Sequence, residues 1–381
     1  ALAAIARFSA KYGNARLIEV DAVSYTGIIK ANQQSFGKAV IPHYRFDKAD
    51  VIVSVAADFL GTWLSGEEHT QQYISNRNHK SLKSGKMSRH VQFEGGMSLT
   101  GTNADVRVAI KPSEEGPLLI ALYNAITGSS LPGALSTNQK AQTALKLVAQ
   151  ELKQSQGRAL VVAGSNDVYI QLLTNAINVA LQSYGNTIDL DNPSQQYKGD
   201  DEAFANFLAE ARRGDVDVVF FLNSNPLYDY PDTAAVKDAL AKVKFKLSFA
   251  DREDETASEL DAIAPDHNFL EAWGDAEPRQ GYYTIVQPTI NPVFNTRQAE
   301  LSLLLWSGED TDYYTFVKQN WEQHILPGTD KTWNDVLQTG FVFKGDRPAS
   351  AYSFDTASLA SVADAIAASS KALAKDVEVQ L

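Results

Sequence analysis

Apolar and polar positions along this chain alternate in the way that α/β proteins require. Short apolar runs of about four to eight residues are separated by longer stretches in which apolar residues recur every three or four positions. The short runs predict buried strands, and the longer stretches predict amphipathic helices. Because strands and helices take turns, the pattern favours parallel sheets covered by helices on both faces.

The first part of the chain predicts one such three-layer parallel sheet. We expect its strands at residues 15–20, 50–57, 89–93 and 106–110. We expect its helices at residues 26–36, 66–79 and 116–126. A polar stretch rich in Gly, Ser and Pro, residues 127–139, then leads into a helix over residues 140–156 and is the best candidate for a domain boundary.

A second series of alternating elements follows this boundary. Its expected strands lie at residues 158–164, 186–191, 215–222 and 244–250, and its expected helices at residues 167–185, 201–214 and 233–243. The fold class is therefore α/β, with two tandem doubly wound, Rossmann-like domains at residues 1–150 and 151–381. Four prolines between Pro265 and Pro292 predict a long surface excursion over residues 265–300 of the second domain.

Composition limits the partners of the protein. The chain has 34 Lys and Arg against 46 Asp and Glu, and its formal net charge of -12 repels a nucleic-acid backbone. No apolar run approaches the length of about 20 residues that a membrane-spanning helix needs. We therefore expect no nucleic-acid binding and no direct membrane insertion, so that any membrane contact comes through partner proteins.

Cysteine is absent from the sequence. Disulfides, a thiol nucleophile, thiolate zinc sites and iron–sulfur clusters held by this chain are therefore excluded. The six histidines lack the spacing that places two imidazoles on one metal ion. The glycine pattern of dinucleotide sites, the P-loop, HExxH and GxSxG are also missing from the sequence, which removes the commonest α/β enzymes.

Two polar stretches are candidates for binding chemistry, and each has a simpler explanation. Gly164–Val168 lies where a strand ends and a helix begins, so its amides could hold an anion. A tight turn with Asn166 or Asp167 as the helix cap explains the same residues and is favoured. The carboxylates of residues 251–261 could hold a hard cation, but Thr256–Glu259 has the pattern of a capping box.

The excursion holds a third candidate. His267, Glu271 and Asp275 lie close together in sequence and would suit acid–base chemistry if their side chains converged. The same region concentrates aromatic side chains that could form an interface with a partner or pack onto their own domain. These aromatic residues are Phe269, Trp273, Tyr282 and Tyr283.

Four segments resemble, in the same order, the middle domains of the molybdopterin oxidoreductase family: residues 35–63, 93–116, 215–231 and 255–292. Within that family, "DHNFLEAWGDAEP" and "NADVRVAIKPSEEG" look most like the large iron–sulfur subunit of bacterial alternative complex III. In that subunit a molybdopterin-type domain without pterin is joined to an iron–sulfur domain. The chain starts without Met and with helical character, and we expect it to be part of a larger polypeptide.

The resemblance also identifies the positions where active members hold their cofactor. Ala57 and Asp58 stand where a Gly-Asn type turn approaches the pterin dinucleotide, and an anionic Asp58 there would repel a pyrophosphate. The stretch Glu94, Gly95 and Gly96 stands in place of an Asp-Pro-Arg type sequence, which keeps the acid and loses the cation. Ser24 falls where the metal ligand of the family would lie, although a structural serine in a turn is the favoured interpretation.

These departures predict a vestigial pocket, formed by Ser24, Asp58, Glu94, Gly95 and Gly96, that binds no cofactor and no metal. The resemblance then implies a non-catalytic scaffold within a respiratory quinol oxidoreductase, on the periplasmic face of the bacterial inner membrane. Its partners would be the other subunits of the membrane-bound complex and the iron–sulfur domain of the same polypeptide, which would carry the clusters. Two alternatives stay open: a fragment of an active molybdenum oxidoreductase with Ser24 as ligand, and an α/β module that binds a small ligand.

Overall fold

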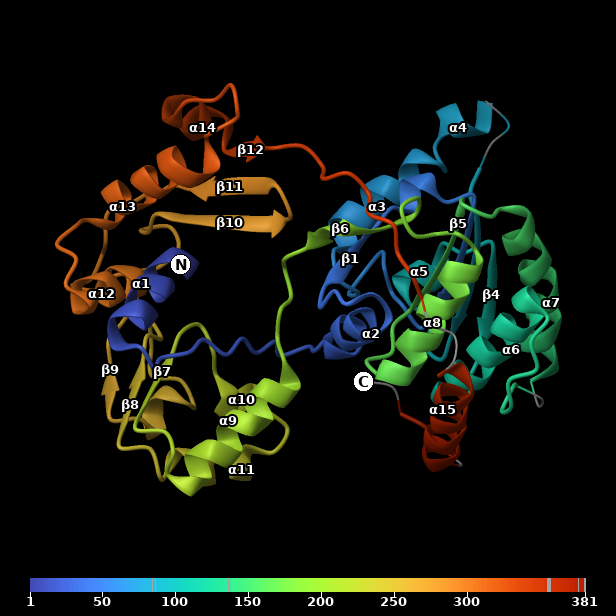
Figure 1. The fold of residues 1–381 in the computed structure, drawn as a ribbon, viewed down its shortest axis with the longest axis horizontal. Helices are drawn as coiled ribbons and strands as arrows, with labels where there is room; N and C mark the ends of the chain where they lie inside the picture. Colours follow the sequence, from blue (N-terminus) through green and yellow to red (C-terminus); the bar gives the residue numbers. More distant parts are fainter. Residues whose placement is uncertain (84, 86, 136–137, 355–357, 376, 380–381) are drawn as a thin grey trace. The chain divides into compact units, whose positions relative to one another are not determined.

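The computed structural model describes residues 1–83, 85, 87–135, 138–354, 358–375 and 377–379. The chain forms two compact units (Figure 1), each assembled from separate stretches of sequence. Residues 25–197 and 346–381 make up the large unit, and residues 1–24 and 198–345 make up the small unit. This division differs from the boundary predicted at residue 150, because contacts between elements, rather than their order, decide which segments fold together.

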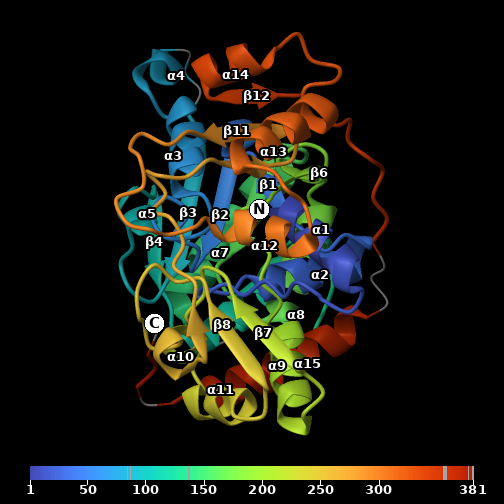
Figure 2. The same ribbon diagram turned by 90° about the vertical axis from the view of Figure 1, so that its left-hand side faces the viewer.

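A parallel sheet with the strand order β4-β3-β2-β5 forms the centre of the large unit. Its strands are β2 (Val51–Val55), β3 (Arg89–Glu94), β4 (Val106–Ala109) and β5 (Ala159–Ala163). Figure 2 shows β2, β3 and β4 side by side. Every residue of β2 and β5 is buried, as expected of strands with helices on both faces. The predicted boundary would have separated β5 from β2, its hydrogen-bonded neighbour.

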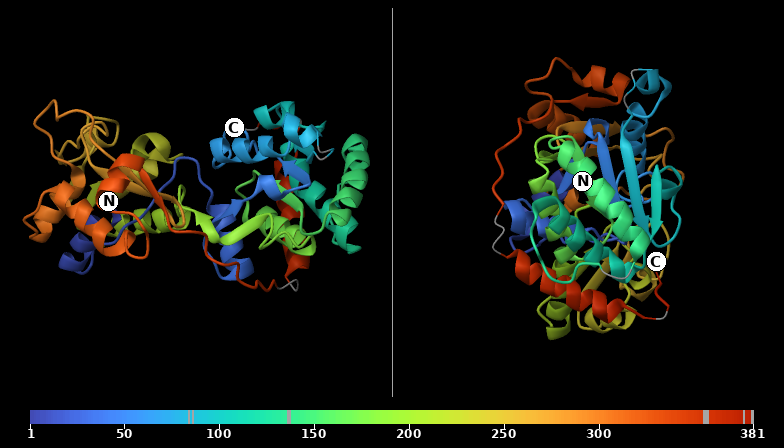
Figure 3. Two further views of the ribbon diagram at one scale, coloured as in Figure 1. Left: turned by 90° about the horizontal axis from the view of Figure 1, so that it is seen from above. Right: turned by 90° about the vertical axis from the view of Figure 1, so that its right-hand side faces the viewer.

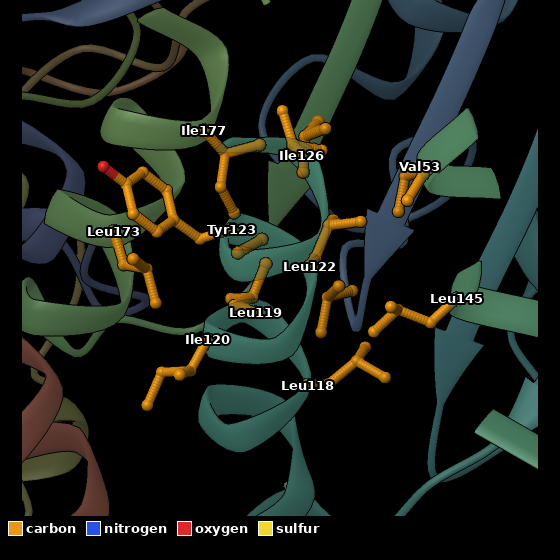
Figure 4. Packing of buried hydrophobic residues seen from close by; sticks show 14 of the residues in the cluster. Val53, Leu118, Leu119, Ile120, Leu122, Tyr123, Ile126, Leu145, Leu173 and Ile177 are labelled. Carbon is orange, nitrogen blue, oxygen red and sulfur yellow. The ribbon is translucent and has the colours of Figure 1, made fainter. Parts of the chain in front are cut away.

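Alternate strand residues of this sheet face two different cores. Val53 and Val161 face the core formed with helices α6 (Glu115–Thr127), α7 (Gln139–Gln154), α8 (Val168–Ala180) and α15 (Leu359–Leu373). Figure 4 shows Val53 in the same core as Leu118 and Leu122 of α6. Helix α15, red in Figure 3, packs against α6 and α8. Ile52 and Leu160 point the other way and pack with Phe46 and Phe59, whose rings stack 4.2 Å apart.

The remaining elements of the large unit are short. Helix α2 (Thr26–Phe36) matches its predicted bounds and packs against α8. Strand β1 (Ile41–Tyr44) pairs antiparallel with β6 (Ile188–Ser194). The others are α3 (Gly66–Ser75), α4 (His79–Lys83), α5 (Leu99–Thr102) and the 3-10 turns η1 (Phe46–Lys48) and η2 (Pro112–Glu114).

The small unit contains a second parallel sheet, β7-β8-β9. Its strands are β7 (Val218–Phe221), β8 (Phe245–Ser248) and β9 (Ala262–Ile263). The helices beside it are α9 (Asp201–Arg213), α10 (Pro226–Asp229) and α11 (Thr233–Leu240). Phe204 and Phe207 of α9 and Val236 of α11 share one core with Phe221. The predicted strands and helices of this region are confirmed.

The predicted excursion over residues 265–300 contains regular structure that the proline pattern concealed. Strands β10 (Gly274–Arg279) and β11 (Tyr282–Val286) form an antiparallel hairpin that continues to β12 (Phe341–Phe343). Pro278 lies in β10 where the pairing register shifts, so its missing amide hydrogen costs no ladder bond. Gly281, with a φ of 80°, makes the turn.

The remaining helices of the small unit accompany this hairpin. They are α1 (Leu2–Tyr12), α12 (Ala299–Ser307), α13 (Tyr313–Asn320), the π-helix η4 (Trp321–Ile325) and α14 (Trp333–Thr339). Trp321 is fully buried, and its indole Nε1 donates to Asp275 at 2.9 Å. This bond ties the helical layer to β10.

Two local predictions were wrong. Residues 15–20 form no strand; they connect α1 of the small unit to the large unit, and Glu19 makes a single backbone contact to Asp200. Thr256 starts no α-helix, since only a 3-10 turn, η3 (Ala257–Glu259), follows. Its hydroxyl donates to Asn225 at 2.6 Å, so a tertiary contact replaces the predicted capping bond.

Candidate functional site

The carboxyl ends of the parallel strands in the large unit form the edge at which a ligand site is expected. Along the chain, β2, β3 and β4 extend the sheet in one direction, and β5 then returns to the other side of β2. In open α/β sheets, ligands bind in the crevice where the strand order reverses in this way. At this edge Glu94 is the last residue of β3, and the loops that follow β2 and β5 hold Asp58 and Asn166.

The crevice between β2 and β5 is closed by the chain itself. Ala56 has a φ of 55°, which turns its carbonyl oxygen toward Gly164. A Cβ placed at Gly164 would lie 2.2 Å from that oxygen, so the two backbones are in direct contact. Helix α2 approaches the same edge, and the amide of Gly27 in its first turn donates to Asn166 Oδ1 at 2.8 Å. A backbone donor that could hold an anion is therefore already paired.

Asp58 directs its carboxylate at the start of the short helix α5. Oδ1 accepts a hydrogen bond from the Thr100 amide at 2.9 Å, and Oδ2 accepts one from the Thr62 amide at 3.3 Å. The Thr100 hydroxyl in turn accepts from the Leu60 amide at 2.9 Å. Asp58 thus holds its own loop against α5 by bonds to backbone amides.

Glu94 reaches the same helix from the neighbouring strand. Its carboxylate is only 3% exposed and accepts from the Ser98 hydroxyl at 2.6 Å and the Ser98 amide at 3.2 Å. Ser98 is the N-cap of α5 and also accepts from the Gly101 amide at 2.9 Å. A Cβ at Gly101 would lie 1.9 Å from Glu94 Oε1, so this close approach requires glycine.

Glu94 remains ionised despite its burial. Loss of solvation alone would raise the pKa of this carboxyl group, but hydrogen bonds from Ser98, Arg107 and Gln92 together hold its pKa below the ordinary value. Two carboxylates, Asp58 and Glu94, therefore accept hydrogen bonds at the start of the short helix α5.

Glu94 forms an ion pair with a residue of the neighbouring strand β4. Arg107 of β4 donates through Nε to Glu94 Oε1 at 2.5 Å. Because β3 and β4 are parallel and Gln92 is in register with Arg107, these side chains lie on one face of the sheet. The alternation of apolar and polar residues over 105–110 already placed Arg107 on the polar face of a strand. Its pairing with Glu94 could be predicted only from the strand register.

A buried polar chain runs along β3 behind this site. His90, Gln92 and Glu94 are all buried and alternate on one face of the strand. His90 Nδ1 lies 3.1 Å from the Tyr73 hydroxyl, His90 Nε2 lies 3.3 Å from Gln92 Oε1, and the Gln92 amide donates to Glu94 at 3.1 Å. Burial lowers the pKa of His90 to about 4, so the imidazole is neutral near pH 7.

Of the other members of the predicted pocket, Gly95 contacts this site through its carbonyl oxygen, which accepts from Arg107 at 3.4 Å. Gly95 and Gly96 are exposed, and a Cβ at Gly96 would meet no atom within 4 Å. Ser24 is the last residue of the first stretch of the small unit. Its hydroxyl donates to Asp201, at the start of α9, with a distance of 2.6 Å. This hydroxyl is therefore engaged by a carboxylate of the small unit.

The acid–base candidates of the excursion do not converge. His267 Nδ1 lies 2.6 Å from the Thr296 hydroxyl, Glu271 accepts from the Val293 amide at 3.0 Å, and Asp275 accepts from Trp321. Within the described ranges, no three His, Asp or Glu side chains gather closely enough to hold a metal ion. Residues 251–261 therefore form no cation site among the described residues.

The predicted alternative for Gly164–Val168 is confirmed as a helix cap. Asp167 accepts hydrogen bonds from the amides of Tyr169 at 2.7 Å and Ile170 at 3.2 Å at the start of α8. The large unit also has a surface cavity of about 380 Å³, bounded by β3, β4 and α7. Its lining includes Arg89, Val106 and Leu147 and none of the carboxyl-end residues, so it is not the cofactor crevice of the fold.

Comparisons with known proteins place the fold. Acetylene hydratase from Pelobacter acetylenicus matches with a TM-score of 0.55 at 12% identity, over 84% of this chain and 55% of that one. The likeness shows that the two proteins share an α/β fold. The formyltransferase/hydrolase complex from Methylorubrum extorquens also matches, with a TM-score of 0.52 at 15% identity, over 81% of this chain and 87% of that one. The expected pair of α/β Rossmann-like domains of this fold is confirmed.

One curated relative is similar in sequence. The molybdopterin-binding-like subunit of menaquinone reductase from Nitratidesulfovibrio vulgaris is 26% identical over 296 residues, which covers 73% of this chain. The chain spans about two fifths of the length of that relative, 40%. No family model matches the chain. Among the described residues, no helix combines the length and apolar character needed to cross a membrane.

Proposed function

We propose that this chain is the molybdopterin-like, cofactor-free part of a large subunit in a bacterial quinone or quinol oxidoreductase complex. Alternative complex III is the specific complex we favour. The likeness to a menaquinone reductase subunit supports the quinone-linked role, and the shared fold supports descent from a molybdopterin-binding ancestor. In this role the chain is a scaffold for electron-transfer partners rather than a catalyst.

One observation carries the cofactor-free part of the proposal: the carboxylates of Asp58 and Glu94 accept hydrogen bonds from backbone amides at the start of α5. An anionic dinucleotide needs the amides of Ser98 and Thr100, or others beside them, as free donors. Those amides donate to the two carboxylates instead. A pyrophosphate at this edge would also face the negative charge of Asp58 at short range, which costs on the order of kcal/mol, whereas the charge of Glu94 is paired with Arg107. The residues present therefore do not fit the group.

The partners and location follow from the same proposal. We expect iron–sulfur clusters in another domain of the same polypeptide, because this chain has no cysteine to hold one. We expect attachment to the membrane through the other subunits, on the periplasmic face of the inner membrane. The absence of a membrane-spanning helix among the described residues is compatible with this placement.

Substitution of Ser24 tests the scaffold role against a molybdenum enzyme. In the assembled complex, Ser24→Ala should leave quinol oxidation close to wild type, since the hydroxyl donates to Asp201 and has a structural role. Asp201→Asn is the matched control, because it weakens the same contact from the other side. Abolished turnover in Ser24→Ala alone, with intact assembly and intact iron–sulfur signals, would favour a metal-ligating Ser24.

A further inference from the structure

The net charge of the protein resides entirely in one of its two units. The small unit has 16 Lys and Arg against 28 Asp and Glu, whereas the large unit has 18 of each kind. The small unit therefore carries the whole formal charge of -12. A charge asymmetry of this size creates a strong negative potential over one unit and attracts positively charged surfaces to it.

This acidic unit also exposes a cluster of large apolar side chains. We define the apolar patch by five residues on two neighbouring segments, residues 266–273 and 287–297. They are Phe269 (71% exposed), Leu270 (41%), Ile290 (46%), Val293 (67%) and Phe294 (77%). Single exposed apolar residues are common on protein surfaces, but a group of this kind marks an interaction site.

The two segments are held together by their own hydrogen bonds. The amides of Thr289 and Ile290 donate to the Leu270 carbonyl at 2.8 and 3.1 Å. Glu271 accepts from the amides of Val293 at 3.0 Å and Asn268 at 3.1 Å. The polar groups of both segments thus bond inward to each other, and the apolar side chains are the part presented to solvent. This is the reverse of the usual arrangement in a surface loop.

We propose that the apolar patch docks a partner protein whose contact surface has an apolar centre surrounded by Lys and Arg. The proposal rests on the proposed function, in which the chain is a subunit of a complex. Charge complementarity selects this occupant: a second copy of the small unit would bring together two surfaces of like charge, and an anionic membrane would be repelled. Phe269 and Phe294 are the central anchors, because buried aromatic side chains dominate the energetics of interface cores.

Site-specific photo-crosslinking in the full-length subunit, within its native complex, tests the proposal. Phe294 is replaced by p-benzoylphenylalanine, and the linked peptide is identified by mass spectrometry. We expect a crosslink to another subunit, in a peptide rich in Lys and Arg. Its yield should fall about threefold or more on moving the purified complex from low to high salt, and by a similar factor when Phe269→Ser is added.

Tyr228 provides the matched control position. It is 74% exposed, close to the 77% of Phe294, and it lies in the small unit outside the patch. Benzoylphenylalanine there should give no comparable crosslink. The proposal is overturned by a crosslink from position 294 to its own chain, to a second copy or to lipid, by a linked peptide without basic residues, or by equal yields at the two positions. None of these results bears on cofactor content, so the proposed function is tested separately by metal and pterin analysis.

Discussion

Arg107 of β4 donates to Glu94, the last residue of the neighbouring parallel strand β3, at 2.5 Å. Glu94 is almost fully buried, and Arg107 is one quarter exposed. The pair holds the carboxylate in place against α5, and through α5 it fixes the loop of Asp58. A site that could have held a charged ligand is stabilised instead by charges of the chain.

Glu94→Gln should therefore destabilise the large unit by about 2–3 kcal/mol, because it leaves Arg107 without its charged partner and weakens the cap of α5. Urea denaturation of the full-length subunit measures this loss. The double variant Glu94→Gln, Arg107→Gln should lose less than the sum of the two single changes, since the two residues interact directly.

Arg158→Gln is the matched control for this prediction. Arg158 pairs with Asp50 at 2.5 Å, but both side chains are more than half exposed, and we expect a loss below about 1 kcal/mol. Equal losses in Glu94→Gln and Arg158→Gln would contradict the structural role assigned to Glu94.

Buried histidines should make the large unit sensitive to acid. Burial lowers the pKa values of His69 and His90 to about 4, below the ordinary value of 6.5. Below pH 6.5 the unfolded chain takes up protons that the folded chain does not, so stability is present near pH 7 and is lost as the pH falls toward 4. Each histidine contributes on the order of 2–3 kcal/mol to this loss.

Denaturation curves between pH 7 and pH 4 measure this dependence. His90→Gln should flatten the curve by removing one titrating group, although stability at pH 7 also falls. His79→Gln, at an exposed position, should keep the wild-type slope. An unchanged slope in His90→Gln would contradict the assignment of His90 as a buried neutral group.

The sequence predicted the features of this structure that local patterns determine. It did not predict the features that depend on contacts between distant segments. Helix α2 had its predicted bounds because Gly37, in a left-handed conformation, ends it by local geometry. The placement of β5 beside β2 depended on burial of both strands against shared helices, which no local pattern encodes.

The candidate site shows the same division. Asp58 and Glu94 were identified by resemblance, and both lie at the strand ends. Their partners, Thr100, Ser98 and Arg107, were missed because they depend on how α5 and β4 pack. Ser24 was grouped with them by its position in the sequence, but the structure pairs it with Asp201 of the small unit.

Trp273 distinguishes the two interpretations of the aromatic side chains in residues 265–300, which are an interface with a partner and packing onto their own domain. Its ring lies 4.8 Å from that of Tyr314 and 6.4 Å from that of Trp333, and it packs against the core of the small unit. Trp273→Ala should therefore lower the stability of this unit by about 2–4 kcal/mol. Thermal unfolding of the purified full-length subunit measures the change.

Phe269→Ala, in the same excursion, is the control for Trp273→Ala. Phe269 is exposed, so its removal should change stability by less than about 0.5 kcal/mol while weakening assembly of the complex. Normal stability and poor assembly in Trp273→Ala would place Trp273 at an interface instead.

The central proposal is that this chain binds no molybdenum–pterin cofactor, and the molybdenum and pterin content of the purified full-length protein tests it most directly. Because Asp58 and Glu94 occupy the donors at the carboxyl edge of the sheet, we predict no molybdenum above background and no extractable pterin. Near-stoichiometric molybdenum together with an extractable pterin would contradict the account and identify the chain as part of a working molybdenum oxidoreductase.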